Sequence, residues 1–301
     1  MSHHKTESNG ARLRNLMDAG CVAAPGAFNG LVARAVKQAG FDACYVSGGA
    51  TSTAMGMPDV GLQTLEEFCR AIRDVSLASG LPVLADADTG FGEAETARRT
   101  VIEYHRAGAS GLHLEDQVFP KRCGHLGGKT LVPIDHMVEK VQWASKAARD
   151  TGDGTFIVCA RTDAFSVDGI AASIERAKAY VHAGADMIFP EGLGTAEDFK
   201  AFAQAMESMG EAKPYLLANM TEFGTTDMIP LNTFAEMGYS IVIYPVTTLR
   251  IAMKAVTDAL AQLKESGTAE GLLSSMQTRD ELYELLGYTP GTPWEVPTAN
   301  R

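Results

Sequence analysis

The sequence has no long apolar run and no excess of positive charge, and each absence excludes a class of protein. None of its apolar stretches approaches the ~20 residues that a membrane-spanning helix needs. Its 26 lysines and arginines are outnumbered by 37 aspartates and glutamates, which gives a net charge of −11. Because non-specific nucleic-acid binding needs a basic surface, we expect neither a membrane protein nor a nucleic-acid-binding protein.

Targeting signals, linkers and a disulfide framework are also lacking. Residues 1–10 are polar and have no apolar centre of a secretory signal, and no linker or low-complexity tract divides the chain. The five cysteines are an odd set without framework spacing, which is typical of a reducing compartment. We therefore predict a cytoplasmic location and a single domain over residues 1–301, with a polar N-terminal arm (1–10) and a C-terminal tail (289–301).

Short apolar runs alternate with helix-periodic segments along most of the chain. Eight runs are expected to form strands: residues 21–24, 43–47, 82–86, 111–115, 156–161, 187–190, 215–219 and 241–244. Helical periodicity is found in residues 65–79, 94–105, 137–148, 170–182 and 196–206, and again after the last strand in 249–263 and 272–286. Glycines suited to close several of these helices precede the next strand: Gly40, Gly80, Gly108, Gly184 and Gly238.

Eight strand–helix units with nearly continuous apolar strands predict an α/β fold, a parallel TIM-type (β/α)8 barrel with extra C-terminal helices. An open, doubly wound sheet is the alternative. Most of the runs end on polar residues: Ser47, Asp86, Asp88, Glu115, Asp116, Arg161, Asp163, Glu191, Asn219 and Tyr244. In a closed barrel these ends meet at a single mouth, where such barrels keep their active sites. The polar ends therefore favour the barrel.

Two aspartates mark a candidate metal site. Asp86 and Asp88 stand two residues apart after the third run, so both carboxylates of an extended strand would point to the same side. Two carboxylates with waters and a substrate oxygen are usual ligands of Mg²⁺, and Glu115 adds a further carboxylate at the next strand end. Mn²⁺ is the alternative ion. The alternative role is that one aspartate only caps the next helix. Histidines are not clustered and the loop has no second cysteine, so zinc is not expected.

One cysteine has the setting of a reactive thiol. Cys21, Cys44 and Cys159 lie in apolar runs and Cys69 on an amphipathic helix, where burial as a small hydrophobic residue is expected. The remaining thiol lies in Lys121-Arg122-Cys123-Gly124-His125-Leu126-Gly127-Gly128-Lys129. Neighbouring cations favour its thiolate and lower its pKa below the free value of about 8.5. We predict that Cys123 donates or accepts a proton, the alternative being a solvated basic turn.

Three arginines and two polar stretches predict a pocket for a small polycarboxylate. Arg161 ends a strand, Arg250 follows the last strand, and Arg279 lies in the C-terminal helical region. An arginine at a barrel mouth can bind a carboxylate through two parallel hydrogen bonds, although a surface salt bridge is its common role. Ser47-Gly48-Gly49 and Asn219-Met220-Thr221 add backbone and side-chain partners for such an anion.

Seven motifs together resemble the isocitrate lyase and phosphoenolpyruvate mutase superfamily over residues 11–288. They are Tyr45-Val46-Ser47-Gly48-Gly49, Asp86-Ala87-Asp88-Thr89-Gly90-Phe91-Gly92, Glu115-Asp116-Gln117, Lys121-Arg122-Cys123-Gly124-His125, Ala160-Arg161-Thr162-Asp163-Ala164, Phe189-Pro190-Glu191 and Asn219-Met220-Thr221-Glu222-Phe223-Gly224. Within the superfamily the sequence is most similar to the 2-methylisocitrate lyases, and its Lys-Arg-Cys-Gly-His motif is highly specific.

The resemblance implies a Mg²⁺-dependent carbon–carbon lyase that cleaves 2-methylisocitrate to pyruvate and succinate, in the methylcitrate cycle of propionate catabolism. It implies that Asp86 and Asp88 hold Mg²⁺, with Asp59 and Glu115 nearby through water. The residues implied to contact substrate are Ser47, Gly48, Gly49, Cys123, Gly124, Arg161, Glu191, Asn219, Met220, Thr221, Arg250 and Arg279. Catalytic roles are implied for Cys123, His125, Arg161 and Glu191. Such enzymes are typically homotetramers in which the eighth helix packs on a neighbouring subunit.

Other activities stay open. The continuation Leu126-Gly127-Gly128-Lys129 resembles the isocitrate lyases, whose substrate lacks one methyl group, and Phe223 is a candidate for shaping the space beside that methyl. Oxaloacetate decarboxylation and dimethylmalate cleavage are further alternatives. Phosphorus–carbon chemistry is disfavoured, because such relatives carry an asparagine-containing loop where Cys123 stands. A catalytically silent barrel that only binds or assembles is the last alternative.

Overall fold

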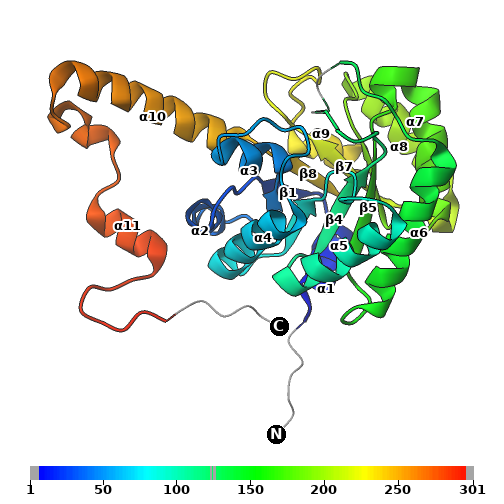
Figure 1. Ribbon diagram of the computed structural model, residues 1–301, viewed down its shortest axis with the longest axis horizontal. Coiled ribbons are helices and arrows are strands. Elements are labelled where there is room, and N and C mark those ends of the chain that lie inside the picture. Colours follow the sequence, from blue (N-terminus) through cyan, green and yellow to red (C-terminus); the bar gives the residue numbers. More distant parts are fainter. Residues whose placement is uncertain (1–6, 123, 125–126, 296–301) are drawn as a thin grey trace, which may run out of the picture.

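The strands form one eight-stranded parallel sheet that is rolled into a nearly closed barrel (Figure 1). The computed structural model describes residues 7–122, 124 and 127–295. Its strands are β1 (Val22–Pro25), β2 (Cys44–Val46), β3 (Val83–Asp86), β4 (Gly111–Glu115), β5 (Ile157–Thr162), β6 (Met187–Pro190), β7 (Tyr215–Asn219) and β8 (Ile241–Tyr244). The sheet runs from β1 through β8 and back to β2, and a parallel bridge between Gly26 and Tyr45 joins its two edges. The predicted barrel is confirmed, and the open sheet is excluded.

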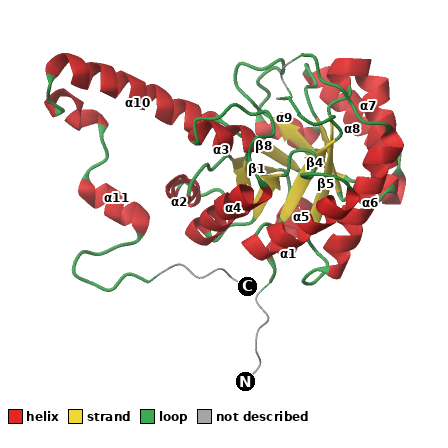
Figure 2. Ribbon diagram, viewed as in Figure 1, coloured by secondary structure: helices red, strands yellow, loops and turns green. Residues whose placement is uncertain are grey.

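Helices alternate with the strands and cover the outside of the barrel (Figure 2). They are α1 (Asn9–Ala19), α2 (Gly30–Gln38), α3 (Gly48–Ala54), α4 (Leu65–Ser79), α5 (Ala94–Ala107), α6 (Ile134–Asp150), α7 (Phe165–His182), α8 (Ala196–Glu207), η1 (Gly210–Ala212), α9 (Leu231–Glu236), α10 (Thr247–Ser266), η2 (Glu270–Ser275) and α11 (Arg279–Leu286). All five glycines predicted to close helices have positive φ angles, between 65° and 108°. Glycine adopts this conformation without a steric penalty, which explains the sharp entries into the strands.

The predicted element boundaries are accurate for the strands and wrong for one helix. Each predicted strand agrees with the observed one to within one residue at both ends. Residues 272–286, predicted as one helical segment, form part of η2 and the separate helix α11. The break has a local cause, because the Thr278 hydroxyl accepts a hydrogen bond from Glu281 N while the Glu281 side chain accepts one from Thr278 N. This capping box starts a new helix at Arg279.

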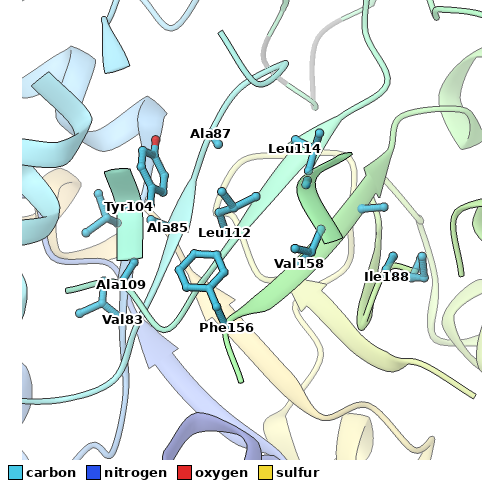
Figure 3. Close-up of a cluster of buried hydrophobic side chains, with 14 of the residues drawn as sticks. Val83, Ala85, Ala87, Tyr104, Ala109, Leu112, Leu114, Phe156, Val158 and Ile188 are labelled. Carbon is cyan, nitrogen blue, oxygen red and sulfur yellow. The ribbon is translucent and has the colours of Figure 1, made fainter. Parts of the chain in front are cut away.

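Two hydrophobic clusters lie on opposite faces of the barrel wall. The outer cluster packs between the strands and the surrounding helices, and Figure 3 shows part of it, including Leu112 and Leu114 of β4. The inner cluster fills the barrel with residues such as Leu84 and Met187, and Leu13 of α1 belongs to it. Successive side chains of a strand point to opposite faces. His113 and Glu115 of β4, which alternate with the two leucines, therefore belong to the inner face that leads to the mouth.

The helices after β8 leave the barrel (Figure 1). Leu249, in the first turn, is the buried residue of α10, whereas apolar side chains farther along are exposed: Ile251, Met253, Val256, Leu260 and Leu263. The chain then returns, and α11 packs against α2. In the part of the chain that the structure describes, no helix is both long and apolar enough to cross a membrane.

Three of the four cysteines predicted to be structural are fully buried. They are Cys44, Cys69 and Cys159, whereas Cys21 is only partly buried. Burial raises the pKa of the Cys44 thiol to about 12 and the pKa values of Cys21 and Cys69 to about 11. These thiols are therefore protonated at neutral pH, as expected of small hydrophobic residues. Cys123 and His125 lie outside the described residues.

Candidate active site

A cavity of about 310 Å³ opens at the carboxyl ends of the strands. Ten of the residues predicted for the site line it: Ser47, Gly49, Asp59, Asp86, Gly124, Arg161, Glu191, Asn219, Thr221 and Arg250. A larger cavity of about 520 Å³ lies near the opposite ends of the strands, beside His105 and Phe156, and none of the predicted site residues lines it. The grouping of functional side chains, rather than the volume, therefore identifies the mouth as the candidate active site.

Asp86 and Asp88 come together by a route that differs from the predicted one. β3 ends at Asp86, and Asp88 follows in a left-handed turn with a φ angle of 45°. Strand alternation therefore does not explain their proximity. Instead, Asp88 N donates a hydrogen bond of 2.9 Å to Asp86 Oδ1, a turn that aspartate stabilises with its own side chain. Both residues are buried.

Lys121 lies inside the carboxylate cluster. Its Nζ is 2.8 Å from Asp88 Oδ1 and forms a short ion pair with Asp59 Oδ1. Burial favours the neutral amine, but the charges of Glu115, Asp86, Asp88 and Asp59 outweigh it and raise the pKa of Lys121 well above its usual value. Lys121 was predicted from the sequence only as a cation near Cys123. The structure assigns it to the carboxylates.

The two aspartates have opposite pKa shifts. Burial would raise the pKa of Asp86, but the positive charges of His113, Lys121 and Arg161 outweigh it and hold the pKa below its usual value. Burial itself lowers the pKa of His113 to about 4, so at neutral pH the two charged neighbours are Lys121 and Arg161. Burial and then the charge of Asp86 raise the pKa of Asp88 to about 6. Of the two aspartates, Asp88 is thus the one that protonates first as pH falls.

The donor set around these aspartates fits a divalent cation. Asp88 Oδ1 and both carboxylate oxygens of Glu115 are buried, and the Glu115 oxygens accept no hydrogen bond from the described residues. Asp88 Oδ1 is paired with the Lys121 ammonium at 2.8 Å, and Glu115 Oε2 lies in a longer ion pair with Arg161 at 3.3 Å. Among those residues, no three carboxylate, histidine or cysteine side chains converge tightly enough to hold an ion alone. Mg²⁺ keeps several waters and commonly takes only one or two carboxylates from a protein. A pair of buried aspartates with two further carboxylates nearby, Asp59 and Glu115, matches that preference.

Arg161 is held in place by three carboxylates. Its Nε and Nη2 donate hydrogen bonds of 2.9 and 3.0 Å to the two oxygens of Asp163. Its Nε also lies 3.3 Å from Glu115 Oε2, and its Nη1 lies 3.4 Å from Glu191 Oε2. The guanidinium stacks over the Phe189 ring at 5.2 Å. Arg161 is therefore a fixed positive charge in the lining of the cavity, and it can bind an anion without reorganising.

At two glycines, Gly48 and Gly124, the backbone lies close to the charged side chains of the cavity. Gly48 N donates a hydrogen bond of 3.1 Å to Asp86 Oδ2, and a Cβ at Gly48 would lie only 2.8 Å from that oxygen. A Cβ at Gly124 would lie 2.5 Å from Arg161 Nη2 and 2.5 Å from Glu191 Cγ. Side chains are therefore excluded at both positions. Ser47 caps α3 by accepting a hydrogen bond from Ala50 N.

The remaining predicted contacts fall into two groups. Asn219 Nδ2 donates to Glu191 Oε2 at 3.2 Å, and Thr221 Oγ1 donates to Asn219 Oδ1 at 2.7 Å, so these side chains form one network. Arg250 lines the cavity and lies over the exposed ring of Phe223 at 5.2 Å. By contrast, Met220 is buried in the outer cluster. Arg279 is exposed at the start of α11 and does not line this cavity.

Two inward-facing aromatic residues were missed by the sequence-based prediction. Tyr45 lines the cavity, and its hydroxyl lies 2.6 Å from His113 Nε2. His113 Nδ1 lies 3.7 Å from Asp86 Oδ1. The signal was present, because His113 stands two residues before Glu115 on the same strand and so shares its face.

Comparison with known proteins identifies related sequences. The family model described as phosphoenolpyruvate phosphomutase matches residues 13–264. A Corynebacterium glutamicum protein named "Probable 2-methylisocitrate lyase 1" is 53% identical over 264 residues, which cover 88% of this chain and 84% of the relative. The 2-methylisocitrate lyase of Aeropyrum pernix is 46% identical over 283 residues, covering 94% of this chain and 88% of the relative.

Solved structures have the same fold. The crystal structure of 2,3-dimethylmalate lyase, a PEP mutase/isocitrate lyase superfamily member, superposes with a TM-score of 0.85 at 35% identity, covering 93% of this chain and 92% of that chain. Phosphonopyruvate hydrolase in complex with oxalate and Mg²⁺ superposes with a TM-score of 0.82 at 28% identity, covering 93% and 95%. With its barrel, its family-model match and these identities, the chain belongs to the PEP mutase/isocitrate lyase superfamily.

Proposed function

We propose that this protein is a Mg²⁺-dependent carbon–carbon lyase that cleaves 2-methylisocitrate to pyruvate and succinate. The observation that carries the proposal is the cavity lined by both Asp86 and the fixed cation Arg161, with Asp88 buried beside Asp86 and hydrogen bonded to it. A polycarboxylate with a hydroxyl group needs both a cation site and an arginine. The names of the relatives from Corynebacterium glutamicum and Aeropyrum pernix support this substrate.

Asp86 and Asp88 would hold Mg²⁺, and Asp59 and Glu115 would bind its waters. When bound, the ion supplies a Lewis acid for the hydroxyl and carboxylate oxygens of the substrate. Lys121 neutralises part of the cluster's charge in the absence of an ion, since its ammonium contacts Asp59 and Asp88. The complex of phosphonopyruvate hydrolase with oxalate and Mg²⁺ supports magnesium as the metal.

The chain's own groups would divide the work of bond cleavage. A base of the cavity, for which we propose Glu191, would take the C2 hydroxyl proton, so that this oxygen forms the carbonyl of pyruvate as the C2–C3 bond breaks and the bonding electrons move to C3. Arg161, fixed by Asp163, would stabilise the charge that develops. Glu191 and Asn219, hydrogen bonded to each other beside Arg161, would orient the succinate half together with Thr221.

Cys123 would deliver the proton that converts the C3 carbanion to succinate. Its described neighbour in the chain, Gly124, lies against Arg161 and Glu191, which supports this role. His125, two residues on, would assist this transfer. Ser47, Gly48 and Gly49 would bind the pyruvate half from the side of Asp86.

An oligomer would explain two features that a single chain leaves without a role, the position of Arg279 and the exposed apolar residues of α10. Arg279 lies on α11, away from the mouth of its own barrel, and α10 exposes a row of apolar residues. We propose that the protein is a homotetramer in which α10 packs on a neighbouring subunit and Arg279 reaches a neighbour's site. A role in the methylcitrate cycle, in the cytoplasm, belongs to the same proposal.

The test is a comparison of initial rates with 2-methylisocitrate, isocitrate, 2,3-dimethylmalate and oxaloacetate in the presence of Mg²⁺. Pyruvate, glyoxylate, propionate and succinate are measured separately, and an EDTA sample is the control. We expect a large kcat/KM advantage for 2-methylisocitrate that disappears with EDTA and returns with Mg²⁺. Preference for another of these acids would contradict the proposed substrate, and full activity in EDTA would contradict the metal.

A further inference from the structure

Lys129 is a buried cation to which the proposed chemistry gives no role. Its side chain is 1% exposed, and its Nζ donates hydrogen bonds to Asp163 Oδ1 at 2.9 Å and to the Gly124 carbonyl. Burying an ammonium group costs several kcal/mol unless it is paired and hydrogen bonded. Its two partners come from different elements, the end of β5 and the loop after β4, so the lysine links them.

The partner carboxylate is itself anchored in the barrel wall. Asp163 N donates to Asp116 Oδ1 at 2.9 Å, and Asp116 Oδ2 accepts hydrogen bonds from the Tyr180 hydroxyl at 2.8 Å and from Arg176 at 3.1 Å. Tyr180 and Arg176 belong to α7 on the outside of the barrel. The position of Asp163 is thus determined by the scaffold and not by the loop.

One carboxylate therefore holds two cations. Asp163 accepts two hydrogen bonds from the Arg161 guanidinium and one from Lys129, and its own two oxygens are fully buried. Because Lys129 Nζ also donates to the Gly124 carbonyl, it links Gly124, five residues earlier in the chain, to this fixed carboxylate. Gly124 in turn is packed so closely against Arg161 and Glu191 that a single added carbon would collide with both.

We propose that Lys129 is a positioning residue, which seats the Gly124 backbone against Arg161 and Glu191 by tying it to the carboxylate that aligns Arg161. Asp163 then fixes the position of both Arg161 and the loop that contains Gly124. The proposal rests on the function proposed above for its effect on turnover, although the tether can be measured without any substrate. Misplacing reacting groups by about 1 Å can cost ~100-fold in rate.

The experiment compares wild type, Lys129→Met and the control Lys200→Met, which removes an exposed lysine of α8. In Lys129→Met we expect kcat to fall at least ~50-fold while KM changes less than ~5-fold. Amide hydrogen exchange of the peptide spanning residues 117–131 should accelerate at least ~10-fold, with exchange in β3 and β7 unchanged. Lys200→Met should match wild type in every measurement.

A second variant separates a missing cation from a general loss of stability. Lys129→Ala leaves a space for a primary alkylammonium ion, so butylammonium should restore part of kcat, whereas tetramethylammonium at the same concentration should not. Wild-type kcat and exchange in Lys129→Met, or exchange that accelerates equally in all peptides, would overturn the proposal. If wild type cleaves none of the tested acids, the proposed function fails, and exchange in residues 117–131 alone decides whether the tether exists.

Discussion

The Lys121 ammonium lies 2.8 Å from the Asp88 carboxylate, in the place where a metal-binding cluster needs positive charge. Even with this partner, burial and the nearby Asp86 raise the pKa of Asp88 to about 6. The site therefore holds more negative charge than its own cations balance. A divalent cation would relieve that excess, and its absence should be measurable as lost stability.

Asp88→Asn should stabilise the metal-free protein at alkaline pH. Between pH 3.8 and about 6 the folded chain holds a proton on Asp88 that the unfolded chain has released, so the stability from this group falls as pH rises through that window. Removing the charge should raise the free energy of unfolding at pH 8 in EDTA by on the order of 1–2 kcal/mol. Thermal unfolding of both proteins checks this.

Two controls sharpen that prediction. At pH 5 the gain should shrink, because wild-type Asp88 is then largely protonated in the folded state. Added Mg²⁺ should raise the Tm of wild type but not of Asp88→Asn, which should also lose activity. A lower Tm of the variant at pH 8 in EDTA would contradict the assignment of excess negative charge.

Gly124→Ala should inactivate the enzyme without unfolding it. The added methyl group would meet Arg161 Nη2 and Glu191 Cγ at 2.5 Å, so the loop backbone must move away from both groups. We expect kcat to fall ~100-fold or more and Tm to change by less than about 3 °C. Gly127→Ala is the matched control on the same loop, because its Cβ would meet nothing within 4 Å and its activity should be that of wild type.

Cys123→Ser should keep substrate and Mg²⁺ binding but lose turnover. A hydroxyl is a far weaker acid than the thiol, and positioned proton transfer typically contributes ~10²–10⁴-fold to rate. We expect kcat to fall within that range, with Mg²⁺ affinity by calorimetry unchanged. Cys21→Ser makes the same replacement far from the cavity and should have no effect. Normal turnover of Cys123→Ser would remove this residue from the mechanism.

Charges placed on the apolar row of α10 should dissociate the oligomer. Val256 and Leu260 are 46% and 59% exposed in the single chain. If a neighbouring subunit covers them, the double variant Val256→Lys and Leu260→Lys would bury two unpaired charges. Light scattering at micromolar concentration should then report a smaller species than for wild type. Asp258→Lys adds the same charge of +2 on the side of the helix that carries the exposed Lys254–Asp258 ion pair, and it should leave the mass unchanged.

Local patterns were sufficient to predict the barrel and the location of its mouth. Buried parallel strands are continuous apolar runs, so all eight were found, and Asp86, Arg161 and Glu191 follow directly from the strand ends. The capping box that separates η2 from α11 was also readable, because Thr278 is followed three residues later by Glu281. Overlooking it produced one helix in place of two.

Other features depend on contacts between distant parts of the chain. Lys121 contacts Asp59, 62 residues earlier, whereas its sequence neighbours suggested a role beside Cys123. Lys129 finds Asp163, 34 residues later, and neither residue carries a motif for that pairing. The position of Arg279 depends on where α11 packs, and α11 packs against the distant helix α2. The periodicity within α11 does not determine that contact.

The departure of α10 has a consequence for how the protein responds to dilution. If a neighbouring chain covers α10, as proposed, it completes the burial of a helix in which the described part of its own chain buries only Leu249. Association and folding are then linked by mass action, so the unfolding temperature should rise with total protein concentration. Chains present at low copy number would be the first to unfold, and expression level itself would become a determinant of how long this enzyme survives.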